Sequence, residues 1–342
     1  MNSSHKLSSF YCYLPSFVFG IIALLSAHYK GLSFYFLFIF SFVIIPLLEL
    51  FLPPISNNVK VKRKLPNSLV PILIVPLNIY ILYVYLNLIS TNSLSTIELI
   101  GAWFTLGIIC GVYGINVAHE LGHRNCKWKQ FLAQILLMTS LYMHFFIEHN
   151  RGHHKRVGTK QDPATALKNE SVYSFWRRCI YNSFISAYNI EKLRVNKLNL
   201  RPILHNKFIH FVIIEACFIA GVYAFFGTNA CIFFVLSAGY GILLLETINY
   251  IEHYGLLRKK IATGVFEKVN ETHSWNSNHI LGRYLLFELT RHSHHHHNSQ
   301  KEYYELESMP KSNQLPTGYP GMMLISLIPP LFFKTMNKRL TS

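Results

Sequence analysis

Six long apolar stretches divide the chain, and polar residues collect between and after them. Each stretch is close to the roughly 20 residues that a helix needs to cross a bilayer. The polar residues are concentrated at 119–207 and 250–320. The pattern predicts an all-α integral membrane protein, a single domain whose six transmembrane helices carry a helical polar cap. The expected spans are 10–28, 32–53, 68–90, 98–118, 208–226 and 229–249.

The first stretch is long and aromatic and lacks a small-residue cleavage site, so it does not resemble a removable signal peptide. The second stretch follows almost at once. We therefore expect both to be retained as spans.

Lysine and arginine number 32 against 16 acidic residues, an excess that is also found in nucleic-acid-binding proteins. Here the basic residues lie between spans, whereas the connection 91–97 has none. By the positive-inside rule, the basic connections face the cytoplasm. The N-terminus and the cap then also lie inside, with Lys30 as a mild exception. The basic clusters are Lys60, Lys62, Arg63 and Lys64, followed after the fourth span by Arg124, Lys127 and Lys129.

The six cysteines form no CxxC pair, and four lie in or beside apolar stretches. They are typical of packing residues. A fused iron–sulfur or zinc domain would need clustered cysteine pairs, so any such electron-transfer centre must belong to a separate protein.

Histidines carry the candidate chemistry, because nine of the 18 are candidate ligands that fall into four compact groups beside the predicted spans. Two imidazoles four residues apart on a helix face the same way and can bind one metal ion. The first two groups have this spacing. The groups are His119-Glu120-Leu121-Gly122-His123, Glu148-His149-Asn150-Arg151-Gly152-His153-His154, Asn249-Tyr250-Ile251-Glu252-His253-Tyr254-Gly255 and His292-Ser293-His294-His295-His296.

Each group alone has a simpler explanation: a chance HExxH match, an interfacial histidine, or a solvated histidine run. Four groups at membrane boundaries instead indicate one shared site, which must lie on one face of the membrane. A crossing by the 17-residue apolar stretch 131–147 would send the second group to the opposite side. We therefore predict that 131–147 is a re-entrant or protein-buried helix.

Nine imidazoles exceed the three or four ligands of a zinc site and indicate two metal ions. Imidazole suits iron and zinc alike, so spacing alone does not name the metal.

The segments HELGH, EHNRGHH, NYIEHYG and RHSHHHH resemble the four histidine boxes of the bacterial membrane alkane 1-monooxygenase family, within the membrane fatty acid desaturase and hydroxylase superfamily. Their order and spacing also match. NYIEHYG is the most specific, since the other boxes would also admit desaturases. The resemblance runs from about the first span through Pro320 and includes the segments His273-Ser274-Trp275-Asn276-Ser277 and Asp162-Pro163-Ala164.

The resemblance implies an O₂-dependent terminal hydroxylation of an alkane or similar hydrocarbon to a primary alcohol. It implies two non-haem iron ions and two electrons from a separate rubredoxin with its reductase. It also implies a protein of the inner cell membrane with its active site on the cytoplasmic side. The implied iron ligands are His119, His123, His149, His153, His154, His253, His292, His295 and His296.

By the same resemblance, Asp162, Glu252, Glu120 and Glu148 would accept hydrogen bonds from ligand N–H groups. For Glu120, Glu148 and Asp162, a polar position in a basic cap explains the residue almost as well. Glu246 lies inside a span, where a carboxylate is costly, so it is either a functional candidate or the partner of an arginine or lysine in the cap.

His294 stands where the family box usually has an acidic residue, so His294 or His297 could compete for metal. Aromatic residues of the second span, Phe34, Phe36, Phe38, Phe40 and Phe42, could limit the depth of a substrate tunnel.

Three other functions are compatible with parts of the pattern. A fatty acid desaturase or terminal fatty-acid hydroxylase would use the same iron ligands. A membrane zinc protease would use HELGH, with Glu120 as its base, but leaves seven histidines without a role. A metal transporter would need ligands through the depth of the membrane, whereas these cluster at one face.

Overall fold

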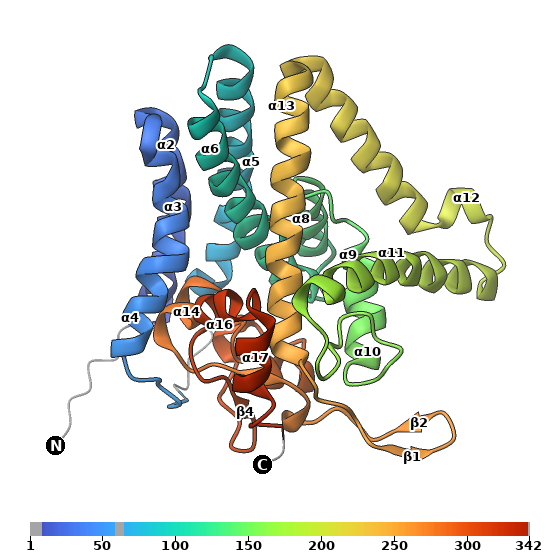
Figure 1. Cartoon of the computed structure of the whole chain (residues 1–342). Coiled ribbons are helices and arrows are strands. Elements are labelled where there is room, and N and C mark those ends of the chain that lie inside the picture. The colour runs from blue at the N-terminus through green and yellow to red at the C-terminus, as the bar shows by residue number, and fades with distance from the viewer. Residues whose placement is uncertain (1–8, 59–64, 341–342) are drawn as a thin grey trace.

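The computed structural model describes residues 9–58 and 65–340 as a helical bundle that stands on a polar cap (Figure 1). Within these residues, five helices are long and apolar enough to cross a membrane. The predicted basic cluster Lys60, Lys62, Arg63 and Lys64 lies outside the described residues. The five helices are Tyr11–Tyr29, Gly31–Phe51, Asn67–Thr91, Thr96–Gly122 and Lys207–His253.

The first two spans form a hairpin at Lys30, which has a positive φ of 56°. The ammonium of Lys30 donates to the side chain of Asn92 at 2.8 Å, and the backbone N–H of Gly31 donates to Glu98 at 3.0 Å. These bonds place the hairpin turn beside the connection between the next two spans. The hairpin consists of α1 (Ser9–Tyr13), η1 (Leu14–Phe17), α2 (Val18–Tyr29), η2 (Gly31–Tyr35), α3 (Phe36–Ile39), η3 (Phe40–Ile44) and α4 (Ile45–Phe51).

The third span, α5 (Leu65–Thr91), and the fourth are joined by a short loop. Ser95 caps the fourth span by accepting from the N–H of Glu98, while Glu98 accepts from the N–H of Ser95. This reciprocal capping fixes where the helix begins. The fourth span then runs without a break through α6 (Thr96–Ile109), the π-helical η4 (Cys110–Asn116) and α7 (Val117–Gly122).

The long helix α13 (Lys207–His253) has two arms that meet at Gly227, as Figure 1 shows at the upper end of the bundle. Gly227 has φ 81° and ψ 178°, a conformation that is essentially limited to glycine. The sequence places the boundary between the stretches 208–226 and 229–249 at this point. Because the two arms form one helix, α13 covers two of the six predicted apolar stretches. The five candidate helices therefore account for all six.

The stretch 131–147 does not form one continuous helix. The helix α8 (Lys127–Met138) ends in turns, Leu141 has a positive φ of 51°, and α9 (Phe145–Glu148) begins after them. The N–H of Met143, freed by this break, donates to the carboxylate of Glu215 at 2.6 Å. A side chain of the first α13 arm thus satisfies a backbone donor that would be costly to leave unpaired.

Below the bundle, the helix α11 (Val172–Lys197) runs across the direction of the spans (Figure 1). The cap surrounds its N-terminal half and the end of α13. The remaining helices of this region are η5 (His149–His153), α10 (His154–Arg156), α12 (Pro202–His205), η6 (Glu271–His273), α14 (Ile280–Leu285), α15 (His292–His297), η7 (Tyr303–Glu305), α16 (Tyr319–Ser326) and α17 (Pro329–Met336).

The all-α prediction is incomplete, because the cap also contains four short strands. β1 (Lys260–Ala262) and β2 (Val265–Phe266) form an antiparallel hairpin, and β3 (Trp275–Asn276) pairs in parallel with β4 (Asn313–Gln314). Strands of two or three residues are too short to show the alternating pattern from which a strand is predicted.

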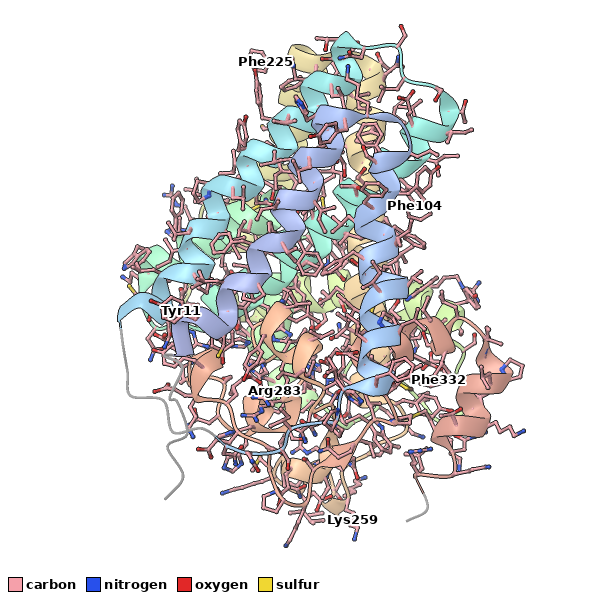
Figure 2. The ribbon with its side chains drawn as sticks, turned by 90° about the vertical axis from the view of Figure 1, so that its left-hand side faces the viewer. Tyr11, Phe104, Phe225, Lys259, Arg283 and Phe332 are labelled. Carbon is pink, nitrogen blue, oxygen red and sulfur yellow. The ribbon has the colours of Figure 1, made fainter. Side chains whose placement is uncertain are left out.

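Apolar side chains cover the spans, and charged ones collect in the cap (Figure 2). Phe225, at the upper end of the bundle, is 86% exposed, whereas Lys259 and Arg283 lie in the lower part. An exposed apolar surface of this extent suits contact with lipid. The protein is therefore a membrane protein with a polar region at one end of its bundle.

Candidate metal centre

Two π-helical segments occur beside the histidine groups. The segment η4 (Cys110–Asn116) directly precedes the helix that carries His119, and η5 (His149–His153) itself contains two of the predicted site histidines. Such segments are rare and occur frequently at functional sites. In η5 the wider turn allows the rings of His149 and His154, five residues apart, to approach with Nε2 atoms 3.1 Å apart.

All nine predicted histidines come together in two adjacent groups at the base of the bundle. In each group, one nitrogen from every ring lies within 4.8 Å of the others. The first group holds His119, His123, His149, His154 and His295, and the second holds His153, His253, His292 and His296. Segments far apart in sequence therefore meet at this one place.

The shortest contacts in the first group form a chain from His123 through His149, His154 and His295 to His119. Each contact joins two Nε2 atoms at 3.0–3.1 Å. In the second group, His253, His292, His296 and His153 are joined in the same way at 2.9–3.2 Å. A neutral ring nitrogen either donates one proton or offers one lone pair. Hydrogen bonds therefore cannot account for every link of either chain.

A shared cation accounts for these distances. Metal–nitrogen bonds of roughly 2.0–2.1 Å at right angles place neighbouring ligand nitrogens about 3 Å apart. Burial and the neighbouring imidazoles lower the pKa of His123, His149, His154, His292, His295 and His296. These rings are thus neutral at pH 7, the form that binds metal. The donor set fits two metal ions.

Asp162 fixes the ring of His153. Its Oδ2 lies 3.0 Å from Nδ1 of His153 and also accepts a hydrogen bond from the hydroxyl of Thr165 at 2.6 Å. Burial alone would lower the pKa of His153, but the carboxylate of Asp162 outweighs it and raises that pKa. With its Nδ1 held by Asp162, His153 presents Nε2 to the second group.

Glu252 lies beside His292 in a similar role. Its Oε1 is 3.2 Å from Nδ1 of His292, although the angle is not that of a hydrogen bond. The hydroxyl of Tyr319 donates to the same Oε1 at 2.8 Å. Tyr319 comes from α16 and has no local spacing signal, so sequence reasoning missed it.

Glu120 and Glu148 have arginine partners instead of ligand rings. Glu120 pairs with Arg124 at 3.3 Å and accepts from the backbone N–H of Tyr303. Glu148 pairs with Arg156 at 2.7 Å. The cause is local: these carboxylates lie one or two helical turns before an arginine in a densely basic region.

His294, the departure from the family pattern, belongs to neither histidine group. Its Nδ1 accepts from the backbone N–H of Glu307 at 2.7 Å, and its Nε2 lies 3.1 Å from the ammonium of Lys301.

Next to His294, the backbone N–H of Ser293 donates to the side chain of Asn276, which in turn donates to the Ser293 hydroxyl. Asn276 therefore anchors the helix that carries His292, His295 and His296.

Glu246 lies fully inside the protein and is satisfied there. The hydroxyl of Tyr142 donates to Oε1 at 2.8 Å, and the thiol of Cys179 and the amide of Asn249 donate to Oε2. No described histidine of the two groups hydrogen-bonds to Glu246.

A narrow apolar cavity of about 60 Å³ lies within the bundle. Its lining comes from the first, second and fourth spans, the second α13 arm and the cap, and includes Phe42, Val112 and Leu244. Asn116, also in the lining, precedes His119 by one helical turn. Among the second-span aromatics, Phe42 lines this cavity, Phe34 is buried elsewhere in the core and Phe36 is exposed.

The fold and the site define a membrane protein with a histidine-rich metal-binding cluster. A family model described as fatty acid desaturase matches residues 96–322, which contain all nine histidines. The chain therefore belongs to the fatty acid desaturase family.

Within that family, the similar proteins are monooxygenases, which confirms the resemblance seen in the sequence. An alkane 1-monooxygenase of Pseudomonas putida is 38% identical over 72% of this chain and 61% of its own length. Alkane 1-monooxygenase 1 of Alcanivorax borkumensis is 39% identical over 71% and 60%. The xylene/toluene monooxygenase hydroxylase component of Pseudomonas putida is 28% identical over 71% and 64%. The chain spans about three fifths of the length of the alkane 1-monooxygenases that it matches.

Proposed function

We propose that this protein is a non-haem di-iron monooxygenase that converts the terminal methyl group of an alkane or similar hydrocarbon to a primary alcohol. The reaction joins R–CH₃, O₂, two electrons and two protons to give R–CH₂OH and water. The electrons come from a separate rubredoxin and its reductase. The observation that carries the proposal is the convergence of nine imidazole nitrogens beside an apolar cavity.

Two iron ions are the occupants of the two histidine groups. The proposed ligands of one ion are His119, His123, His149, His154 and His295, and those of the other are His153, His253, His292 and His296. Such a centre supplies the reductive activation of O₂ for insertion of one oxygen atom into a C–H bond. All of these ligands are imidazoles, so a carboxylate affects the metal only by contacting a ligand ring, as Asp162 contacts His153.

The chain's own residues orient the ligands and exclude water. Asp162 and Thr165 hold His153, while Glu252 and Tyr319 fix the surroundings of His292. All nine histidines except His154 are buried, which keeps bulk water from the site. Apolar walls then protect a reactive site from side reactions.

The apolar cavity supports a hydrocarbon substrate. Its lining residues Phe42, Val112 and Leu244 offer no partner for a charged group. A hydrocarbon chain that lies along them would present its end near Asn116, one turn above His119. The names of the relatives favour an alkane, and the xylene/toluene relative favours attack at a methyl group more generally.

The topology that fits this function has six crossings, with the two arms of α13 as the fifth and sixth. The segments 119–207 and 250–320 then form a cytoplasmic cap of the inner membrane, and 131–147 stays within the protein without crossing. The break at Leu141 and the bond from Met143 to Glu215 support this path for the chain.

A fatty acid desaturase or terminal fatty-acid hydroxylase is the second candidate, favoured by the description of the matching family model. It would use the same iron ligands and differ in its product. The zinc protease is disfavoured, because the carboxylate of Glu120 is engaged by Arg124 and Tyr303 and is not free to act as a base.

The test is the metal content of the detergent-purified protein and of His153→Ala, measured together with oxidation of octane in the presence of rubredoxin and its reductase. We expect about two irons per chain and O₂-dependent 1-octanol in the wild type, with both reduced in the variant. One zinc per chain and no O₂-dependent product would contradict the proposal. An alkene or hydroxylated fatty acid as the preferred product would favour the second candidate.

A further inference from the structure

An open groove of about 760 Å³ lies on the outside of the bundle, apart from the apolar cavity of the proposed active site. One wall is a face of α11, the second is the α13 arm at Leu243, and the third is the turn that contains His144. Figure 1 shows α11 running across the space below the two α13 arms. The groove is thus bounded by one transverse helix, one span and the turn at His144.

The two faces of α11 differ in character. The face toward the groove carries Tyr173, Trp176, Tyr181 and Phe184, and three of these are at least 40% exposed. The other side carries Arg178, which pairs with Glu170 through two hydrogen bonds of 2.7 and 2.8 Å. Exposed tyrosines and a half-buried tryptophan beside apolar spans are typical of residues at the membrane–water interface.

Arg177 places a positive charge at the edge of the groove. Its side chain is exposed and makes no ion pair or hydrogen bond with the residues that the structure describes, in contrast to the paired Arg178. Ser171, which caps the helix by accepting from the N–H of Ser174, and Ser174 itself also line the groove at the N-terminus of α11, where the helix dipole favours an anion. None of the lining residues is acidic.

His144 supplies an unpartnered polar atom at the inner wall. The side chain is only 6% exposed, and its Nε2 has no hydrogen-bonding partner among the described residues. Burying a polar group without a partner is costly. A turn of the ring toward the groove would let an ester oxygen of a bound ligand satisfy this nitrogen, which a hydrocarbon could not do.

We propose that the groove binds an anionic glycerophospholipid of the surrounding bilayer. Its phosphate lies at Arg177 and Ser174, its ester oxygens approach His144, and one acyl chain follows Tyr181, Phe184 and Leu243. From Ser171 to Phe184, α11 rises by roughly 20 Å, close to the length of an extended acyl chain. The site is independent of the proposed oxidation.

The test is native mass spectrometry of the full-length protein in a neutral detergent, with added dioleoyl-phosphatidylglycerol or dioleoyl-phosphatidylcholine. We expect phosphatidylglycerol to be retained in preference to phosphatidylcholine. Arg177→Gln should weaken that retention about fivefold, as expected for one basic residue at a membrane surface. His144→Phe, which keeps an aromatic ring, should weaken it for both lipids.

Arg201→Gln is the matched control, since Arg201 is exposed, follows α11 and does not line the groove. It removes the same charge and should leave retention unchanged. A photoreactive phosphatidylglycerol should label the peptide 171–184 in the wild type and less so in Arg177→Gln.

Three results would overturn the proposal: equal retention of the two lipids, equal effects of Arg177→Gln and Arg201→Gln, or displacement of phosphatidylglycerol by an equal concentration of oleate. None of these measurements depends on iron or on turnover, so they stand apart from the test of the enzymatic function.

Discussion

The carboxylate of Asp162 lies 3.0 Å from Nδ1 of His153, and both side chains are almost completely buried. The two residues are nine positions apart, on opposite sides of the turn that follows α10. The contact fixes which ring nitrogen of His153 remains for a metal. It also links the Asp162-Pro163-Ala164 segment to the second histidine group.

On the proposed function, Asp162→Asn should lower iron content and hydroxylation together. The amide keeps the size of the side chain but loses the charge that orients and polarises the ring, and such outer partners are typically worth roughly 10–100-fold in metal affinity or activity. Iron per chain and alcohol formation would be measured at several iron concentrations. Glu170→Gln is the control, because Glu170 pairs with Arg178 and does not contact a site histidine. Wild-type iron affinity in Asp162→Asn would show that the contact is only structural.

Tyr319→Phe should reduce activity through Glu252. Loss of the hydroxyl leaves Oε1 without its 2.8 Å donor and frees the carboxylate to move away from His292. An unsatisfied buried group costs about 1–3 kcal/mol of stability. The control is Tyr303→Phe, which removes an equally buried hydroxyl that donates to the backbone of Asn67. Both variants should melt earlier, but only Tyr319→Phe should bind iron more weakly. Equal iron affinity in the two would argue against a positioning role.

On the proposed function, Phe42→Ala should shift the range of hydrocarbons that are oxidised. Phe42 lines the apolar cavity, so its removal lengthens or widens the space for a chain. We expect longer alkanes to gain relative to shorter ones, measured as the ratio of alcohols formed from a mixture of alkanes. Phe36→Ala, on the same span but 58% exposed, should leave the ratio unchanged. The same ratio in both variants would mean that this cavity does not hold the substrate.

Glu120→Gln distinguishes the proposed oxygenase from a zinc protease. Glu120 pairs with Arg124 and accepts a hydrogen bond from the backbone N–H of Tyr303. The variant should therefore lose stability, because removing one partner of a buried ion pair costs about 3–5 kcal/mol. Its turnover per bound iron should stay within about threefold of the wild type, since the Glu120 carboxylate contacts Arg124 and the Tyr303 backbone and no site histidine. A protease would lose its general base and nearly all activity. The measurement is alcohol formed per iron, alongside the melting temperature.

The histidine groups could be predicted because their signals are local. Spacings such as His119 to His123 are set by the geometry of one helix, and the apolar stretches around them fix where they lie. Partners from other elements could not be predicted in this way. Tyr319 reaches Glu252 across 67 positions, and Asn276 reaches Ser293 across 17, so only the folded chain brings them together.

The predicted roles of the carboxylates beside the ligands were only partly confirmed, for a similar reason. Sequence reasoning gave Asp162 and Glu148 the same two readings, yet Asp162 lies against a ligand ring and Glu148 pairs with Arg156. The choice depends on the rotation of each side chain around its helix. In η5 the wider π-helical turn changes that rotation, and hydrophobic periodicity contains no sign of it.

Gly241→Ala should disturb the metal centre from within the membrane part of the bundle. A Cβ at Gly241 would lie 2.7 Å from the Cβ of Cys110 and 2.9 Å from the backbone nitrogen of Gly111, closer than such atoms approach. The α13 arm and η4 would have to separate, at a cost of about 1–3 kcal/mol. These elements lead to His253 and His119, which belong to different histidine groups. The variant should therefore melt earlier and hold less iron.

Gly239→Ala is the control. Its new methyl group, two residues away, would meet no atom within 4 Å, and the variant should gain up to about 1 kcal/mol of helix stability. Melting temperature and iron per chain measured on both variants test this, and a Gly241→Ala protein with full iron would mean that the two groups tolerate a change in helix separation.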